Sequence, residues 1–265
     1  LLDKKNNFQF LSHQYEHESQ LLEIKYKNSI HKIKLNLIGK VQFKNVLMAV
    51  NATIKSGIKI EDILITIKKI KSVEGRFERV GRIKNNSRVI LDYAHTPDAL
   101  KTCLKNIKEQ FPGKKISLVF GCGGNRDQNK RAKMGKIADL FSDKIYLTDD
   151  NPRLEQPSKI RKDIKKGIKK QKVLEFSNRA KAIAEAIKHL NTGEILLVAG
   201  KGHEKVQEIG LKKVFFSDKK NILDAIKIKK LKLSNNLKVN ILNELRIEKK
   251  ISNQISFEKA RINSK

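Results

Sequence analysis

The chain has 265 residues, more than the ~100–200 residues of a usual single domain, so two folded parts and a tail are expected. No apolar stretch near its start resembles a signal peptide or a membrane span. The two cysteines, Cys103 and Cys122, lack the spacing of metal ligands. These features predict a cytoplasmic protein with free thiols and no membrane partner.

The formal net charge of +30 would ordinarily suggest a nucleic-acid or anionic-surface partner. Here lysines are spread over nearly every segment, there is no Trp, and aromatic residues do not alternate with basic ones as in single-strand platforms. Nucleic-acid binding is therefore not expected as the main role, and an affinity that collapses steeply with salt would test it. A positive field that attracts nucleotides and phosphate-bearing substrates fits better.

The first eighty residues are interpreted as the end of a domain. Residues 29–37 alternate like a half-buried strand, and residues 45–55 and 60–70 have the apolar spacing of helices. This block, residues 1–80, holds too few elements to close a nucleotide-binding fold of its own.

From residue 88 onward, strand-like runs alternate with segments of helical period. Strands are expected at residues 88–93, 115–120, 144–148, 172–176, 194–198 and 213–216, and helices at 97–110, 131–141, 157–168, 178–190 and 217–228. The alternation predicts an α/β fold with a mostly parallel sheet covered on both faces, in a domain of residues 81–230. In such sheets, ligands bind beyond the carboxyl ends of the strands. The tail, residues 231–265, is expected to be mostly disordered, with room for one short helix.

Two loops suggest contacts to a nucleotide. Arg76 lies between the two blocks, where an arginine suits a phosphate, although a solvated or ion-paired arginine is the alternative. Asp92 ends a strand and precedes a helix, so its carboxylate suits either a ribose hydroxyl or a capping role. His95, three residues later, also fits a packed histidine without a function.

A glycine-rich turn, Gly121-Cys122-Gly123-Gly124-Asn125-Arg126-Asp127, precedes a predicted helix. Its glycines would let the backbone approach a ligand, and the helix N-terminus favours an anion. The spacing is neither that of a Walker A loop nor that of a GxGxxG dinucleotide fingerprint. A purely structural turn is the alternative, and Arg126 within the loop favours a function.

Two further loops, Asp149-Asp150-Asn151-Pro152-Arg153 and Gly200-Lys201-Gly202-His203-Glu204, each follow an apolar strand-like run. Arg153 offers a planar fork of donors for a carboxylate, and Glu204 offers an acceptor for an ammonium group. Each loop alone is also compatible with a structural turn. Their occurrence at strand ends of one sheet favours a site for a zwitterionic amino acid.

Taken in this order, the five loops resemble those of the Mur ligase family, in the branch that adds the third residue of the peptidoglycan stem peptide. The resemblance covers residues 39–228. These correspond to the last part of the family's central ATPase domain and to all of its Rossmann-like C-terminal domain.

The resemblance implies ATP-dependent ligation of a diamino acid to UDP-N-acetylmuramoyl-L-alanyl-D-glutamate through an acyl phosphate, with ATP and Mg²⁺ as cofactors. Carried over by motif, ATP would be contacted by Asn45 near adenine, Arg76 at the phosphates and Asp92 at the ribose. The amino acid would be held by Arg126, Asp150, Asn151, Pro152, Arg153, Gly200 and Glu204. Gln42, where relatives often have asparagine, departs slightly from the pattern. No catalytic or metal-binding residue is assigned within this chain.

The Asp-Asn-Pro-Arg form of the fourth loop implies meso-diaminopimelate as the added residue, because lysine-adding relatives differ at the arginine position. Diaminopimelate carries a distal carboxylate that lysine lacks. A buried Arg153 left unpaired by lysine would therefore penalise that substrate strongly.

The family's UDP-sugar domain, phosphate-binding loop, magnesium ligands and modified lysine are not found in this chain. We therefore expect a fragment that is inactive by itself, and a non-enzymatic module that binds an amino acid or a nucleotide is the alternative. Residues 255–265 resemble the opening of the next ligase of the pathway, which would make the chain a junction between fused enzymes.

Overall fold

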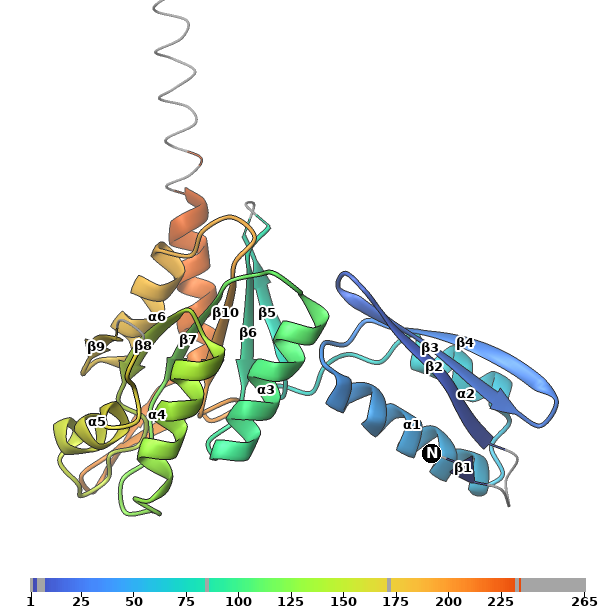
Figure 1. The fold of residues 1–265 in the computed structure, drawn as a ribbon, viewed down its shortest axis with the longest axis horizontal. Helices are drawn as coiled ribbons and strands as arrows, with labels where there is room; N and C mark the ends of the chain where they lie inside the picture. Colours follow the sequence, from blue (N-terminus) through green and yellow to red (C-terminus); the bar gives the residue numbers. More distant parts are fainter. Residues whose placement is uncertain (1, 4–7, 84–85, 171–172, 232–233, 235–265) are drawn as a thin grey trace, which may run out of the picture.

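The computed structural model describes residues 2–3, 8–83, 86–170, 173–231 and 234. These residues form an N-terminal unit, drawn in blue in Figure 1, and a larger α/β unit beside it. The expected helix in the tail and the segment 255–265 lie outside the described residues.

The N-terminal unit is an antiparallel sheet with two helices packed on one face (Figure 1). Its strands are β1 (Leu2–Asp3), β2 (Phe8–Glu16), β3 (Ser19–Tyr26) and β4 (Ser29–Leu35), and its helices are α1 (Lys40–Lys55) and α2 (Ile60–Ile67). Leu22, Ile33 and Leu47 are among the buried residues that join sheet to helices.

The sequence predicted only one strand in this unit, whereas the structure has four. In β2 the register shifts between Phe10 and Ser12, so the alternation of apolar and polar residues is interrupted. Because of that irregularity and of polar residues on both faces, β2 lacks the regular apolar–polar alternation by which a strand is predicted from sequence.

The larger unit has a six-stranded sheet in the order β5-β6-β10-β7-β8-β9. Its strands are β5 (Glu78–Arg82), β6 (Arg88–Asp92), β7 (Ile116–Phe120), β8 (Lys144–Thr148), β9 (Val173–Phe176) and β10 (Ile195–Ala199). Only the edge strand β5 is antiparallel to its neighbour. The predicted α/β fold with a mostly parallel sheet is confirmed.

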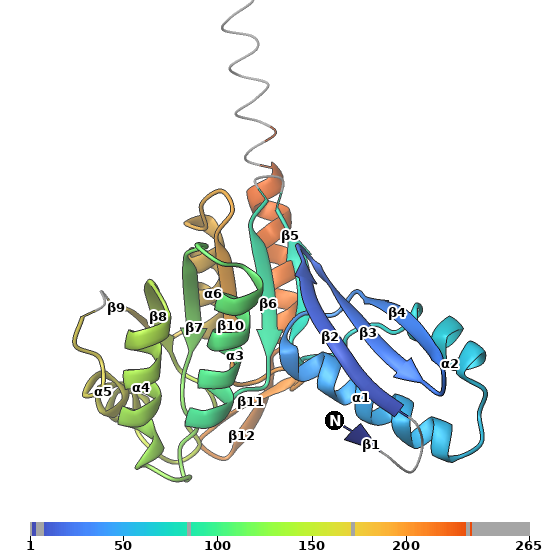
Figure 2. The same ribbon diagram turned by 45° about the vertical axis from the view of Figure 1, so that its right-hand side comes forward.

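Helices cover both faces of this sheet (Figures 1 and 2). One face carries α3 (Pro97–Gln110), α4 (Lys130–Phe141) and α5 (Pro157–Lys165), and the other carries α6 (Arg179–Lys188) and a helix over residues 218–231. All five residues of β10 are buried, with Leu197 facing the first helix layer and Leu196 the second. Such double burial explains why the central strands are continuous apolar runs.

The predicted strand at residues 213–216 was wrongly placed in the main sheet. Instead β12 (Lys212–Phe215) pairs with β11 (Val206–Ile209) as a separate antiparallel hairpin. All four residues of β12 are exposed, which does not suit a sheet covered on both faces. Gly210, with φ +59°, and Leu211 form the two-residue turn that closes the hairpin.

Ion pairs and hydrogen bonds tie the two units together. Glu18, in the turn between β2 and β3, receives hydrogen bonds from Arg79 at 2.6 Å and Arg88 at 3.0 Å in the larger unit. The side chain of Gln110 accepts a hydrogen bond from the Gly39 backbone N–H at 2.7 Å. In Figure 2, the β2–β3 end of the small sheet lies against β5 accordingly.

The cysteines are free, as predicted, and both are buried. Burial raises the pKa of the Cys122 thiol to about 12, and burial together with Asp92 raises the pKa of Cys103. Among the described residues, no helix is both long and apolar enough to span a bilayer. The expected domain boundary at residue 80 falls within β5, and the division into domains stays a prediction.

Candidate amino-acid-binding site

Four loops converge where the parallel strands end. They follow β6, β10, β7 and β8, which are consecutive neighbours in the sheet, so the loops lie side by side. The helix that follows the first of them begins as predicted, with the Thr96 hydroxyl oxygen accepting a hydrogen bond from the Ala99 N–H. Four of the five sequence motifs thus meet at one edge of the sheet.

The glycine-rich loop after β7 packs directly on the loop after β8. A Cβ atom at Gly121 would lie 2.2 Å from the Thr148 carbonyl oxygen, and one at Gly124 would lie 2.0 Å from that of Pro152. The Gly124 N–H also donates to the Asn151 carbonyl at 2.9 Å. In this structure, these two glycines therefore serve the contact between two loops.

Asp150 and Asn151 form the buried floor of the site. The Asp150 Oδ1 atom accepts a hydrogen bond from the Asn151 backbone N–H at 2.7 Å, while Oδ2 is buried and has no partner within the described part of the chain. A Cβ at Gly200 would come within 2.7 Å of that Oδ2 atom. Gly200 also has φ +121°, so both its backbone and its surroundings require glycine.

Arg153 adopts the left-handed region, with φ +52°, which is unusual for a residue with a side chain. Its Nε lies 2.7 Å from Glu208 Oε2, and its Nη1 donates to the Gly124 carbonyl at 2.9 Å. Arg126 is exposed on the glycine-rich loop. A Cβ atom at Gly123 would lie 3.0 Å from Arg153 Nη1 and 3.9 Å from Arg126 Cγ, so both arginine side chains approach this glycine.

Glu204 is held by donors from three segments. Tyr93 donates to Oε1 at 3.3 Å, and both Lys201 Nζ and Asn151 Nδ2 donate to Oε2, at 2.9 and 3.1 Å. Burial alone would raise the pKa of Glu204. The hydrogen bond and charge of Lys201, with Asn151 and Tyr93, outweigh burial and lower the pKa, so Glu204 is held as a carboxylate.

Lys201 and Tyr93 also belong to this cluster, although neither residue was predicted to have a role in the site. Lys201 is fully buried and also donates to Asn151 Oδ1 at 2.8 Å. The one signal for it in the sequence was its position between two glycines in a loop that follows a strand. In a chain so rich in lysine, that signal was masked by composition.

Of the residues predicted to contact ATP, Arg76 lies against Tyr93 and Asn45 lies on α1 of the N-terminal unit. The guanidinium of Arg76 is exposed and stacks over the Tyr93 ring, 4.5 Å from its centroid. Asn45 is exposed on α1, one turn after Gln42, whose side chain donates to the Arg76 carbonyl at 3.1 Å. The structure thus places Arg76 between the N-terminal unit and the amino-acid loops.

Asp92 is engaged with protein groups. Its two carboxylate oxygens accept hydrogen bonds from the backbone N–H groups of Phe77 and Ala94, both at 2.7 Å, and from the Cys103 thiol at 3.2 Å. These bonds fasten the Arg76 segment to the end of β6. Contact of Asp92 with a ribose stays a prediction.

A buried ion pair between Arg179 and Asp218 holds the end of β10, next to the site. Arg179 makes two hydrogen bonds of 2.7 Å to Asp218 and donates to the Ala199 carbonyl at 3.0 Å, directly before Gly200. Burial alone would lower the pKa of Arg179, but Asp218, with Asp150 and Glu204, raises it. Both side chains of the pair are completely shielded from solvent.

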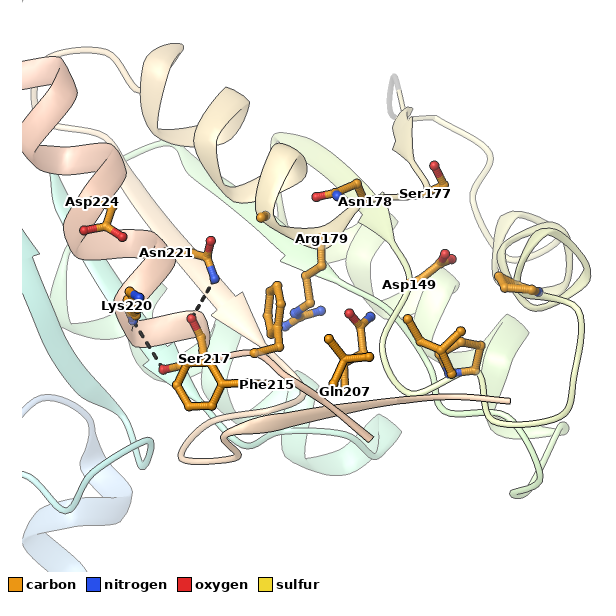
Figure 3. A pocket seen from close by; sticks show the side chains of 16 residues that line it. Asp149, Ser177, Asn178, Arg179, Gln207, Phe215, Ser217, Lys220, Asn221 and Asp224 are labelled. Carbon is orange, nitrogen blue, oxygen red and sulfur yellow. Dashed lines mark hydrogen bonds between the residues drawn. The ribbon is translucent and has the colours of Figure 1, made fainter. Parts of the chain in front are cut away.

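A hollow of about 680 Å³ lies between the β11–β12 hairpin and the start of the helix 218–231 (Figure 3). Its labelled lining includes Asp149, Arg179, Gln207 and Phe215. Gln207 Nε2 donates to the Asp150 carbonyl at 2.6 Å, so this hairpin residue connects the hollow to the floor of the site. Within the described residues, no group of three or more His, Cys, Asp and Glu is arranged to hold a metal ion.

Known proteins share this fold. Residues 75–202 match the family model described as Mur ligase, glutamate ligase domain. The chain therefore carries the C-terminal domain of the Mur ligase family.

Its relatives include particular ligases of this family. It is 43% identical, over 80% of this chain and 43% of the relative, to a UDP-N-acetylmuramoyl-L-alanyl-D-glutamate–2,6-diaminopimelate ligase of Rickettsia rickettsii. A ligase of the same name from Fusobacterium nucleatum is 44% identical over 75% of this chain and 41% of the relative. The chain spans less than half the length of these relatives.

Solved structures show the same fold. A structure of UDP-N-acetylmuramoyl-L-alanyl-D-glutamate–2,6-diaminopimelate ligase aligns with a TM-score of 0.65 and 29% identity, covering 86% of this chain and 46% of that one. The MurF ligase of Thermotoga maritima, solved in complex with ADP, aligns with a TM-score of 0.58 and 18% identity, covering 85% of this chain and 47% of that one. At that identity, the second likeness supports the fold alone.

Proposed function

We propose that this chain provides the amino-acid site of an ATP-dependent ligase that joins meso-diaminopimelate to UDP-N-acetylmuramoyl-L-alanyl-D-glutamate in peptidoglycan synthesis. The observation that carries the proposal is the pair of oppositely charged side chains on neighbouring loops, Arg153 and Glu204, linked through Asn151 and Glu208. The names of the relatives support the choice of substrates.

Each end of this arrangement suits one group of a zwitterion. Arg153, with Arg126 beside it, presents guanidinium donors for the distal carboxylate of diaminopimelate. Glu204 is held ionised and accepts hydrogen bonds from an ammonium group. Asn151 and Pro152 shape the loop between these ends, and Gly200 allows close approach to Asp150.

Selection against lysine follows from the same geometry. Lysine would fill the ammonium position and leave the arginine side without a carboxylate partner. A polar site rejects ligands that leave its groups unpaired. The loss of binding free energy for lysine should therefore exceed the loss caused by one missing methylene group.

In the proposed reaction, ATP supplies activation of the D-glutamate carboxylate as an acyl phosphate, and the diamino acid amine then displaces phosphate. Arg76, Asp92 and Asn45 are proposed on the nucleotide side. Arg76 fits a phosphate, because it is exposed and oriented by the Tyr93 ring. The described residues offer no metal-ligand cluster, so no step here is assigned to Mg²⁺.

Calorimetric titration of the 265-residue chain with meso-diaminopimelate and with L-lysine tests the proposal. We expect saturable binding of diaminopimelate and affinity for lysine at least about a hundredfold weaker. Arg153→Ala should weaken diaminopimelate binding and leave the thermal unfolding temperature nearly unchanged. Equal affinities for the two amino acids would refute the assignment of the arginine, and ATP hydrolysis by this chain alone would contradict its proposed dependence on further domains.

A further inference from the structure

The strand β11 supplies a carboxylate, Glu208, that contacts Nε of Arg153, while the glycine-rich loop contacts Nη1. We propose that Glu208 is a positioning residue that orients Arg153 and thereby determines selection for amino acids with a distal carboxylate. This inference rests on the proposed function and extends it to a residue outside the predicted site.

The donors of Arg153 are divided between protein and solvent. A guanidinium has five N–H donors, and here Nε lies in an ion pair 2.7 Å from Glu208 Oε2, while Nη1 donates to the Gly124 carbonyl at 2.9 Å. Within the described residues, Nη2 has no protein partner, and about a quarter of the side chain, 24%, is exposed. The two contacts therefore fix the plane of the fork and leave its free end for a ligand.

The same strand also holds the backbone of Arg153. The Arg153 N–H donates to the Glu208 carbonyl at 3.0 Å, and the Gly210 N–H donates to the Arg153 carbonyl at 2.8 Å. An isolated bridge pairs Arg153 with Ile209 in parallel fashion. A non-glycine residue at φ +52° persists only where its surroundings fix it, and β11 provides those bonds.

Glu208 touches the ammonium side of the site as well. Its backbone N–H donates to Asn151 Oδ1 at 3.1 Å, and the same oxygen receives Lys201 Nζ at 2.8 Å. The other side-chain atom of Asn151, Nδ2, donates to Glu204. Glu208 thus contacts Arg153, which is proposed to bind the ligand carboxylate. It also contacts Asn151, which holds Glu204, the proposed partner of the ligand ammonium group.

A competing role for Glu208 predicts the opposite effect. If Glu208 occupied the donors that the ligand needs, its removal would tighten binding. The contact is to Nε, whereas Nη2 stays accessible, so orientation is the role that the geometry favours. A neighbouring carboxylate that fixes a ligand-binding side chain is a common device in binding sites.

Glu208→Gln removes the charge and keeps the shape of the side chain. Titrations of the 265-residue chain, by calorimetry for meso-diaminopimelate and by NMR into the millimolar range for L-lysine, should show about tenfold weaker binding of diaminopimelate and less than about twofold change for lysine. Glu185→Gln, at a partly exposed glutamate on α6 that pairs with Lys188, is the matched control and should change neither affinity. Tighter binding of diaminopimelate, no change, or an equal loss for both amino acids would overturn the inference.

A ligand-free measurement separates this inference from the proposed function. The Arg153 Nε–H resonance, assigned by its loss in Arg153→Lys, should be protected from solvent exchange in the wild-type chain and exposed in Glu208→Gln. If the wild-type chain binds neither amino acid, the proposed function fails, and this resonance still decides whether Glu208 orients Arg153. Unchanged protection in Glu208→Gln would refute the positioning role.

Discussion

Lys201 and Glu204 form an ion pair of 2.9 Å in which the lysine is completely buried and the glutamate is partly open to solvent. The buried ammonium also donates to Asn151, so one side chain organises two of the predicted substrate-binding residues. Because Lys201 is shielded, it can influence a bound amino acid only through these neighbours.

Lys201→Met should weaken diaminopimelate binding more than it reduces stability. The change removes the charge opposite Glu204 and the donor to Asn151, and we expect a loss of roughly 1–3 kcal/mol in the free energy of unfolding. Chemical denaturation and calorimetry measure the two effects on the same samples. Lys205→Met, at an exposed lysine one residue after Glu204, is the control. Unchanged affinity in Lys201→Met would contradict the organising role.

Binding of diaminopimelate should stay nearly constant as pH falls from 7.5 to about 5. The pKa of Glu204 is lowered in the folded chain, so its carboxylate, and the attraction it provides, is present above the ordinary value of about 4.3. Affinity should be lost only as pH falls through the lowered pKa. Titrations at several pH values, with Glu204→Gln as the variant that lacks this carboxylate, check the expectation. A midpoint near pH 6 would show that another group controls binding.

Removal of either member of the Arg179–Asp218 pair should destabilise the larger unit strongly. Both side chains are fully buried, so Asp218→Asn or Arg179→Met leaves an uncompensated charge and should cost about 3–5 kcal/mol. The double variant should be less destabilised than the sum of the two single variants, since neither charge remains. Thermal unfolding of the four proteins measures the coupling, and additive losses would contradict it.

Gly200→Ala should abolish amino-acid binding, whereas Gly113→Ala should not. Both glycines have positive φ, but the added methyl group meets Asp150 Oδ2 at 2.7 Å only in the first case, and nothing lies within 4 Å at Gly113. Gly113→Ala therefore isolates the backbone cost, on the order of 1 kcal/mol. Calorimetry and thermal unfolding of both variants test the difference. Retained binding in Gly200→Ala would show that this close approach is dispensable.

The sequence predicted the central fold well, because buried parallel strands such as β7 and β10 are continuous apolar runs. It missed β5 and β11 for a physical reason. Both are antiparallel strands of four or five residues with mixed polarity, and their pairing depends on partners that a local pattern does not reveal.

The candidate site was predicted in part. Loops at strand ends indicated where Arg153 and Glu204 would lie, since parallel strands place their carboxyl ends together. Glu208 and Lys201 were missed because their roles depend on contacts across segments, Glu208 to Arg153 and Lys201 to Asn151, and not on a motif. The proposed ATP contacts of Asn45, Arg76 and Asp92 stay predictions.

The burial of Lys201 sets this lysine apart from the many other lysines of the chain. Among the described residues, it is the single lysine that is buried, while the others lie at least partly on the surface. An exposed lysine can be exchanged for another polar residue at little cost to folding. Position 201 differs from these surface positions, because a residue there must match the two oxygen atoms that Lys201 contacts, Asn151 Oδ1 and Glu204 Oε2.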